Sequence, residues 1–261
     1  MISSKNKPVN NQSKIKDFTT IQYRELLILA KKNYSFSSYD NINYNQNFIL
    51  WRHDIDFSIN RALKLAEIEH SEEINATYFI NIHCDFYNAM EKAQSELIKK
   101  ILGYGHHIGI HFDSGYYNIK NENELDKKIE LESKIIKDIF DYRPTVFSFH
   151  NPNDFLLTCE KEDYGGLINC YSAKFKNEIP YISDSNGYWR FQRLKDALLN
   201  AEEKNLHVLT HPAWWQDKEE EPYFRIKRCV DGRANNTLAN YEKQLDKDGR
   251  LNIGKKTSNP E

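Results

Sequence analysis

Acidic and histidine side chains stand at the ends of short apolar segments that come from different parts of the chain. Asp54 and Asp56 follow FILW, and His111, His150 and His211 end HIGIHF, TVFSFH and HVLTH. An apolar strand does not require an ionisable group at its end, and burying an unpaired charge is costly. We therefore expect these groups to converge, and a shared metal ion would bring them together.

The two aspartates are separated by one residue. Side chains alternate along an extended strand, so Asp54 and Asp56 would face one cavity. One carboxylate could ligate a cation while the other stays free as a base. An isolated Asp-X-Asp is more often a solvated loop or a helix cap, but its place directly after an apolar strand favours the site.

The histidines are each ambiguous when taken alone. His107 and His111 have the spacing of a zinc-binding pair on a helix, but Gly109 and the β-like composition predict a strand, so the pair is not expected to chelate jointly. His106 and His107 begin that strand, where a surface or hydrogen-bonded role is expected. His150 and His211 each end an apolar run with a proline within two residues, a position where a lone histidine is more often structural.

Alternating strands and helices would position these groups. The patterns predict helices over 20–32, 58–69, 89–102, 125–140 and 191–203, and strands over 48–51, 76–82, 107–112, 145–150, 166–173 and 207–211. The run 34–47 is expected to be irregular, and 183–187 reads as a turn. Such alternation predicts a mostly parallel sheet, and active sites of β/α barrels lie at the carboxyl ends of the strands.

Composition restricts the class of protein. The chain has 261 residues, 39% of them hydrophobic and 28% charged, with a formal net charge of -2. This suits one large α/β domain and argues against a disordered polyelectrolyte and against nucleic acid as a partner. The polar segment 1–17 lacks the apolar core of a secretory signal, and no segment has the roughly 20 apolar residues of a membrane span, so we expect a cytoplasmic location.

Taken together, these motifs resemble the polysaccharide deacetylase family, also called carbohydrate esterase family four or the NodB homology family, over about residues 48–213. RHDIDFS resembles the family's paired aspartates, and GHHIGIH resembles its GHEIG-like strand with a ligand histidine. VLTHP resembles its late apolar strand that ends in a histidine. The resemblance implies a distorted or incomplete (β/α) barrel in a single domain.

The sequence departs from the family pattern at Gly115, where the family usually has a second ligand histidine. FSFHNP also stands where an arginine-proline block is usual. By the resemblance, the metal ligands are Asp56 and His111, and we infer that His150 replaces the missing histidine.

The resemblance also implies roles for the other candidates. Asp54 is the expected base, His211 the general acid, and Asp184 the carboxylate that tunes this histidine. Arg190 would bind substrate or hold Asp54, although a surface salt bridge is an equal alternative. Trp214 and Trp215 form either a buried aromatic lid or a platform on which a sugar ring stacks.

The expected activity is metal-dependent removal of an acyl group, here acetyl, from an amide nitrogen of a sugar. The cofactor would be a divalent ion, with zinc favoured over other transition metals, and the substrate a small or lipid-linked sugar in surface-glycan or nucleotide-sugar biosynthesis. The alternatives are a catalytically inactive carbohydrate-binding relative and a hydrolase of a non-sugar amide. We expect an N-terminal helix and irregular segment over 1–45, the deacetylase-like barrel over 46–215, and a C-terminal helix and tail, 216–261, packed on the same domain.

Overall fold

The computed structural model describes residues 17–254. These residues form a single open sheet of ten strands, with helices packed around it. The strand order is β6-β7-β5-β4-β3-β2-β10-β8-β9, with β1 beside β2. All neighbouring pairs are parallel except β6–β7 and β8–β9. The strands are β1 (Ser35–Ser37), β2 (Phe48–Ile55), β3 (Thr77–Ile80), β4 (His107–Asp113), β5 (Val146–His150), β6 (Asp163–Tyr164), β7 (Leu167–Asn169), β8 (Tyr181–Ser185), β9 (Tyr188–Trp189) and β10 (Asn205–Thr210).

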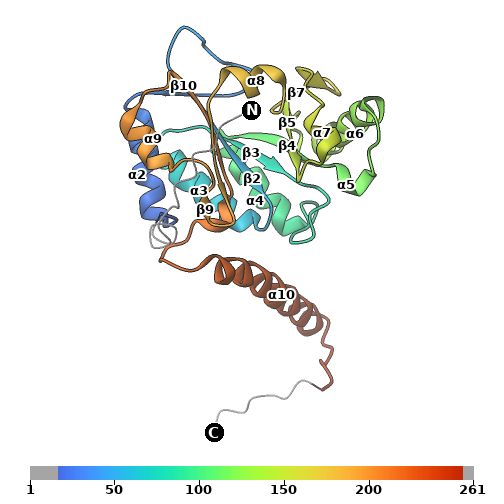
Figure 1. Cartoon of the computed structure of the whole chain (residues 1–261). Helices are drawn as coiled ribbons and strands as arrows, with labels where there is room; N and C mark the ends of the chain where they lie inside the picture. The colour runs from blue at the N-terminus through green and yellow to red at the C-terminus, as the bar shows by residue number, and fades with distance from the viewer. Residues whose placement is uncertain (1–16, 255–261) are drawn as a thin grey trace.

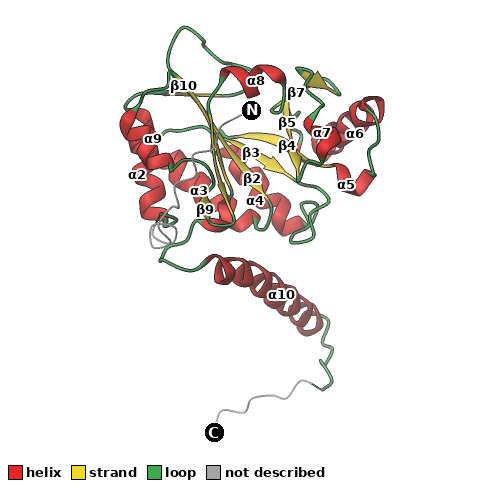
Figure 2. Ribbon diagram, in the orientation of Figure 1, coloured by secondary structure: helices red, strands yellow, loops and turns green. Residues whose placement is uncertain are grey.

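Helices surround the strands, which occupy the centre of the body in Figures 1 and 2. Helix α3 packs against α2 and α4, and α2 packs against α9. The predicted α/β fold, a distorted and incomplete barrel, is confirmed because the sheet is mostly parallel and does not close. The helices are α2 (Thr20–Lys31), α3 (Ile59–Ser71), α4 (Lys92–Gly103), α5 (Ser114–Tyr117), α6 (Glu122–Phe140), α7 (Asp154–Leu157), α8 (Ala173–Glu178), α9 (Leu194–Asn200), α10 (Pro222–Lys247) and the short 3₁₀ helix η1 (Pro212–Trp214).

Strand β2 lies at the middle of the sheet and is buried along its whole length. Ile49 and Trp51 belong to the large core cluster beneath the helices, whereas Phe48 and Leu50 belong to a smaller cluster on the other face. This alternation is the two-residue period of a strand that is buried on both faces. It fixes which polar residues at the end of β2 share a face.

Two predicted loops contain strands. The segment 34–47, expected to be irregular, includes β1, which pairs in parallel with the start of β2. The segment 183–187, expected to be a turn, begins within β8, and the turn into β9 is made by Asn186 and Gly187, whose φ values are 51° and 77°. The polar composition concealed β8 because Ser183 and Asp184 are buried strand residues that look like turn residues.

Helix α10 follows the barrel and runs along one side of it as a separate arm (Figure 1). Proline at the first helical position suits its start, and of its residues only Arg225 and Leu245 are buried. Arg233 forms an ion pair at 2.6 Å with Glu91, which precedes α4. The division into three segments stays a prediction, and residues 1–16 and 255–261 of the terminal segments lie outside the described part of the chain.

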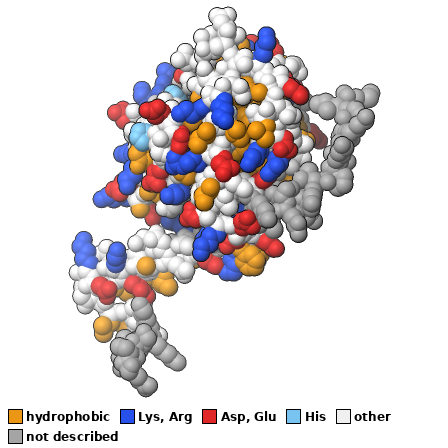
Figure 3. Space-filling view, turned by 90° about the vertical axis from the view of Figure 1, so that its left-hand side faces the viewer, with side chains coloured by type: hydrophobic (Ala, Val, Ile, Leu, Met, Phe, Trp, Pro, Cys, Tyr) orange, Lys and Arg blue, Asp and Glu red, His pale blue; other side chains and the backbone are white. Residues whose placement is uncertain are grey.

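The surface carries both signs of charge, and on the face drawn in Figure 3 acidic and basic side chains are interspersed. Among residues 17–254, no helix is both long and apolar enough to cross a membrane.

Candidate functional site

A cleft of about 350 Å³ opens at the carboxyl ends of the parallel strands. Six strands contribute a residue to its lining: Asp56 after β2, Asn81 after β3, Asp113 in β4, His150 in β5, Ser185 in β8 and His211 after β10. Because parallel strands end at the same edge of the sheet, residues far apart in the sequence meet here.

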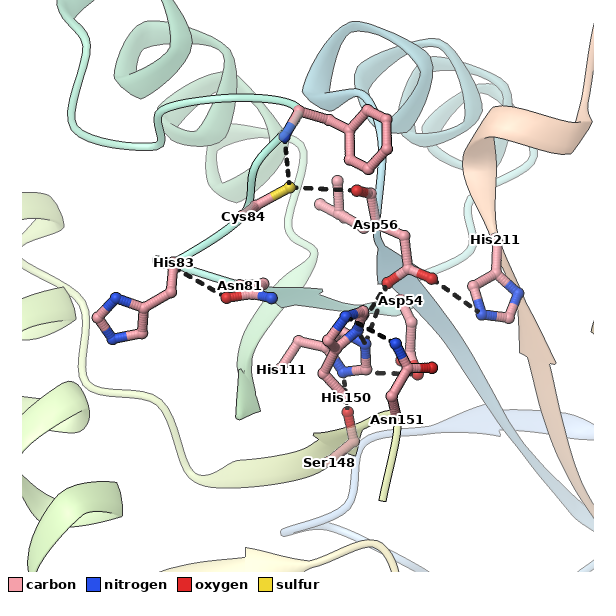
Figure 4. Close-up of polar contacts among 12 residues, drawn as sticks. Asp54, Asp56, Asn81, His83, Cys84, His111, Ser148, His150, Asn151 and His211 are labelled. Carbon is pink, nitrogen blue, oxygen red and sulfur yellow. Dashed lines mark hydrogen bonds and ion pairs between the residues drawn. The ribbon is translucent and has the colours of Figure 1, made fainter. Parts of the chain in front are cut away.

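Asp56, His111 and His150 form the centre of this site, and one ligand atom of each lies within 4.8 Å of the others. Nε2 of His111 is 3.1 Å from Oδ1 of Asp56, and Nδ1 of His150 is 3.5 Å from the same oxygen. The two imidazole nitrogens are 3.1 Å apart. In Figure 4 both rings point toward Asp56.

The carboxylate of Asp56 has an unusual environment. Its Oδ1 atom is buried and makes no hydrogen bond, although two imidazole nitrogens face it. A buried polar atom without a hydrogen bond costs about 1–3 kcal/mol. A cation between this oxygen and the two nitrogens would remove that cost, and two nitrogens with one oxygen are a donor set typical of catalytic zinc sites. The residues present therefore fit a divalent metal.

A neighbouring residue orients one candidate ligand. Oγ of Ser148 lies 2.8 Å from Nδ1 of His111, which leaves Nε2 turned toward Asp56. Ligand histidines are commonly held in this way through their second ring nitrogen. Ser148 is adjacent to His111 in the register of β4 and β5, so the contact follows from strand pairing.

The charges of the cluster reinforce one another. Burial disfavours the ionised form of Asp56, but the imidazoles of His111, His150 and His211 outweigh burial and hold the pKa of Asp56 far below its usual value. Asp56 in turn raises the pKa of His150, against the effect of burial. The site thus holds an anion that attracts positive charge.

Asp54 lies behind this cluster on the same side of β2. It is 2% exposed, and its Oδ2 atom accepts a hydrogen bond at 2.8 Å from Nη2 of Arg52. The same oxygen is 3.6 Å from Nδ1 of His111, whereas Oδ1 is buried without a hydrogen bond. Arg52 is itself buried, and its guanidinium lies 5.2 Å from the ring centre of Phe79. Asp54 is therefore fixed by a cation of its own strand.

His211 and Asp184 form a pair on the opposite side of Asp56. Nδ1 of His211 contacts Oδ1 of Asp184, and the backbone N–H of His211 donates to Oδ2 at 3.1 Å. Nε2 is left free to face the cleft, 3.6 Å from Oδ2 of Asp56. Burial alone would lower the pKa of His211, but the charge and hydrogen bond of Asp184 prevail and raise it to about 9. With this raised pKa, His211 holds its proton at neutral pH.

The two tryptophans predicted to bind substrate occupy different positions. Trp214 is in the lining of the cleft although it is only 4% exposed, and it meets Phe57 edge to face with ring centres 5.7 Å apart. Trp215 has no exposed surface and packs on Phe18, with ring centres 4.8 Å apart, so it is part of the core.

Arg190 is not brought to the cleft: its side chain is exposed, with the guanidinium 5.1 Å from the ring centre of Phe191. The expectation that it holds Asp54 is wrong, because Arg52 makes that contact. Alternation would have identified Arg52, which lies two residues before Asp54 in the same strand.

Sequence reasoning also missed Asn81, His83 and Cys84, which follow β3 and line the cleft. They follow an apolar strand, as the other candidates do. Sγ of Cys84 contacts the backbone oxygen of Asp56 at 3.1 Å, and burial raises the pKa of its thiol to about 11, which disfavours a thiolate ligand. The ring of His83 points away from Asp56 (Figure 4).

No family model matches the sequence, and no curated protein shows significant similarity to it.

The fold is similar to that of several solved structures, of which three follow. The catalytic domain of peptidoglycan N-acetylglucosamine deacetylase from Eubacterium rectale has 16% identity and a TM-score of 0.45, with 76% of this chain and 90% of that chain covered. A family 4 carbohydrate esterase from Bacillus anthracis has 15% identity and a TM-score of 0.44, with 82% and 86% covered. A CE4 family pseudoenzyme from Bacillus anthracis has 11% identity and a TM-score of 0.41, with 73% and 63% covered.

Proposed function

We propose that the protein is a metal-dependent hydrolase that removes an acyl group, namely acetyl, from an amide nitrogen of a sugar. The observation that carries the proposal is the unbonded Oδ1 of Asp56, which faces the nitrogens of His111 and His150. On either side of this candidate metal site stands a group suited to proton transfer, Asp54 and His211.

Asp56, His111 and His150 would hold the metal, with zinc favoured by the donor set. A divalent ion held there would supply Lewis acidity, which makes water a better nucleophile and polarises an amide carbonyl. Asp54 would take the proton of the attacking water. Its Oδ1 atom has no hydrogen bond to lose, and Arg52 fixes the carboxylate through the other oxygen.

His211 would return a proton to the leaving nitrogen. Amides need such a donor because an unprotonated amine anion is a very poor leaving group. Asp184 fixes the ring by accepting from both Nδ1 and the backbone of His211, so Nε2 presents the proton to the cleft. The raised pKa of His211 keeps the donor form populated at neutral pH.

The sugar part of the proposal rests on the motif resemblance and on the aromatic wall of the cleft. Trp214, although only 4% exposed, contributes an apolar side chain of the kind that sugar rings contact, and the polar side chains of Asn81 and Asn151 stand in the same lining. We propose a small or lipid-linked amino sugar of surface-glycan or nucleotide-sugar biosynthesis as the substrate.

The proposal is tested by measuring free amine and acetate released from N-acetylglucosamine derivatives by the zinc-loaded protein. Asp54→Asn and His211→Ala should each lower the rate by about 10²- to 10⁴-fold, the usual contribution of a general base or acid. Arg143→Gln, at an exposed position remote in sequence from these groups, serves as the control. Metal-loaded protein that binds the sugars but releases no amine would instead indicate a carbohydrate-binding relative.

A further inference from the structure

A second cavity, of about 450 Å³, lies between α3, α4 and α10. It shares two lining residues with the cleft of the candidate site, Phe57 and Phe86, whose rings meet edge to face at 4.7 Å. The two cavities are therefore neighbours, separated by one aromatic pair. A ligand longer than one sugar could reach from one to the other.

Three arginines line this second cavity, and no aspartate or glutamate does. Arg61 comes from the first turn of α3, and Arg228 and Arg233 come from successive turns of α10. Arg228 forms an ion pair with Glu220, and Arg233 forms one with Glu91. Glu220 and Glu91 therefore offset part of the positive charge of the arginines, although neither glutamate lines the cavity.

Arg61 lacks a comparable partner. Its Nη2 atom donates to the backbone oxygen of Trp215, its Nε atom is buried without a hydrogen bond, and it forms no ion pair within residues 17–254. Burial lowers the pKa of Arg61, and the nearby charge of Arg228 adds to that effect, which Asp217 only partly opposes. Nη1 of Arg233 is likewise buried without a hydrogen bond. An anion between these two guanidinium groups would satisfy both.

The backbone adds positive potential to the same cavity. The lining includes Asn60 from the first turn of α3 and Ala93 and Gln94 from the first turn of α4. Neither first turn carries an acidic residue, and Glu91 makes no capping hydrogen bond at the start of α4. The amino ends of helices attract anions, and a phosphate suits both these ends and the guanidinium groups.

We propose that this cavity binds a phosphate or diphosphate group, and that the group belongs to the substrate of the neighbouring cleft. The second part rests on the proposed function. The substrate class is then an N-acylated amino sugar that carries a phosphate ester, with the acylated sugar in the cleft and the phosphate among Arg61, Arg228 and Arg233. Nucleotide-linked and lipid-linked sugars share this chemistry.

The binding part is tested by calorimetric titration of the full-length protein with inorganic pyrophosphate, which needs no turnover. Arg61→Gln and Arg233→Gln should each weaken binding by about 10-fold or more, since each removes a charge-assisted hydrogen bond. Asp56→Ala and Arg143→Gln should leave the affinity unchanged. Two arginine variants are used because Arg61 also contacts the core through Trp215 and its loss could disturb folding.

Absence of pyrophosphate binding to the parent would overturn the proposal. Binding that is lost in Asp56→Ala but kept in both arginine variants would also overturn it, because the anion would then occupy the candidate metal site.

The substrate part is tested by turnover: Arg233→Gln should raise KM for N-acetylglucosamine 1-phosphate or uridine diphosphate N-acetylglucosamine about 10-fold and leave KM for unphosphorylated N,N′-diacetylchitobiose unchanged. Equal effects on all three sugars would refute it, whereas pyrophosphate binding without any turnover would refute only the proposed function.

Discussion

Two clusters of histidine and carboxylate lie on opposite faces of β2 and have opposite characters. In the closed cluster, Glu69 accepts hydrogen bonds from Tyr23 and from Tyr78 at 2.6 Å and contacts Nε2 of His53 at 2.6 Å. All four side chains are fully buried. The other nitrogen of His53 meets Oγ1 of Thr210 at 2.7 Å, so nothing in this cluster lacks a partner.

The open cluster, Asp56 with His111 and His150, has similar residue types but borders the cleft. Its central oxygen is buried without a hydrogen bond, and its imidazole nitrogens face one another. Residue type therefore does not separate a structural from a ligand-binding cluster. The difference is that the closed cluster satisfies its own polar groups, whereas the open cluster leaves Oδ1 of Asp56 without a hydrogen bond, which is why we propose that it binds a metal.

Asp56→Ala should give the largest effect on catalysis, a loss of at least about 1000-fold, since Lewis acidity is worth several kcal/mol. The free energy of unfolding of the metal-free protein should fall by less than in Glu69→Ala, because Oδ1 of Asp56 has no hydrogen bond, although the nearby imidazoles lower the pKa of this carboxyl. Amine release and urea denaturation measure the two quantities. A strong loss of stability in the metal-free variant would mean that the open cluster is structural too.

Glu69→Ala should give the reverse result. Removing the acceptor leaves His53, Tyr23 and Tyr78 buried without their common partner, and breaking such a buried pair costs about 3–5 kcal/mol. The kcat of the protein that remains folded at low temperature should stay near the parent value. A stable Glu69→Ala protein without activity would contradict the division between the clusters.

Asp184→Asn should shift the pH profile. With Asp184 charged, the pKa of His211 is about 9, so donor activity should persist through neutral pH and decline as pH rises toward that value. The variant loses the charge that raises this pKa, so the decline should move toward the ordinary histidine value of about 6.5. Because the folded-state pKa is raised, the pair also stabilises the protein below about pH 6.5, and that stability is lost as pH rises through about 9. An unmoved alkaline limb in the rate profile would exclude His211 as the donor.

Trp214→Ala should have the smallest effect on catalysis, a rise in KM of about 2- to 10-fold with the kcat of the folded protein nearly unchanged, as expected for one aromatic contact. Its neighbour Trp215 is the control: both tryptophans are buried, 4% and 0% exposed, so each alanine variant should cost about 3–5 kcal/mol of stability, but only Trp214→Ala should also raise KM. Steady-state kinetics and thermal denaturation distinguish these outcomes. Equal KM values for parent and Trp214→Ala would remove this residue from the substrate site.

Much of the fold was predictable because the central strands are short apolar runs and the helices carry clear periodicity. The placement of Asp56, His111 and His150 near one another was also predictable, since parallel strands end at one edge. Strand β8 was missed because its polar residues are satisfied by tertiary contacts, such as Asp184 with His211. Arg52 could also have been predicted, because alternation along β2 places it on the same face as Asp54.

Metal content of the purified parent, His111→Ala, His150→Ala and His70→Ala, measured side by side by elemental analysis, decides whether the open cluster binds metal. His70 is exposed on α3 and serves as the matched control. We expect near-stoichiometric divalent metal, predominantly zinc, in the parent and in His70→Ala, and its loss in the other two variants. A parent protein that is metal-free and takes up no divalent ion on addition would contradict the metal site and the hydrolytic mechanism built on it.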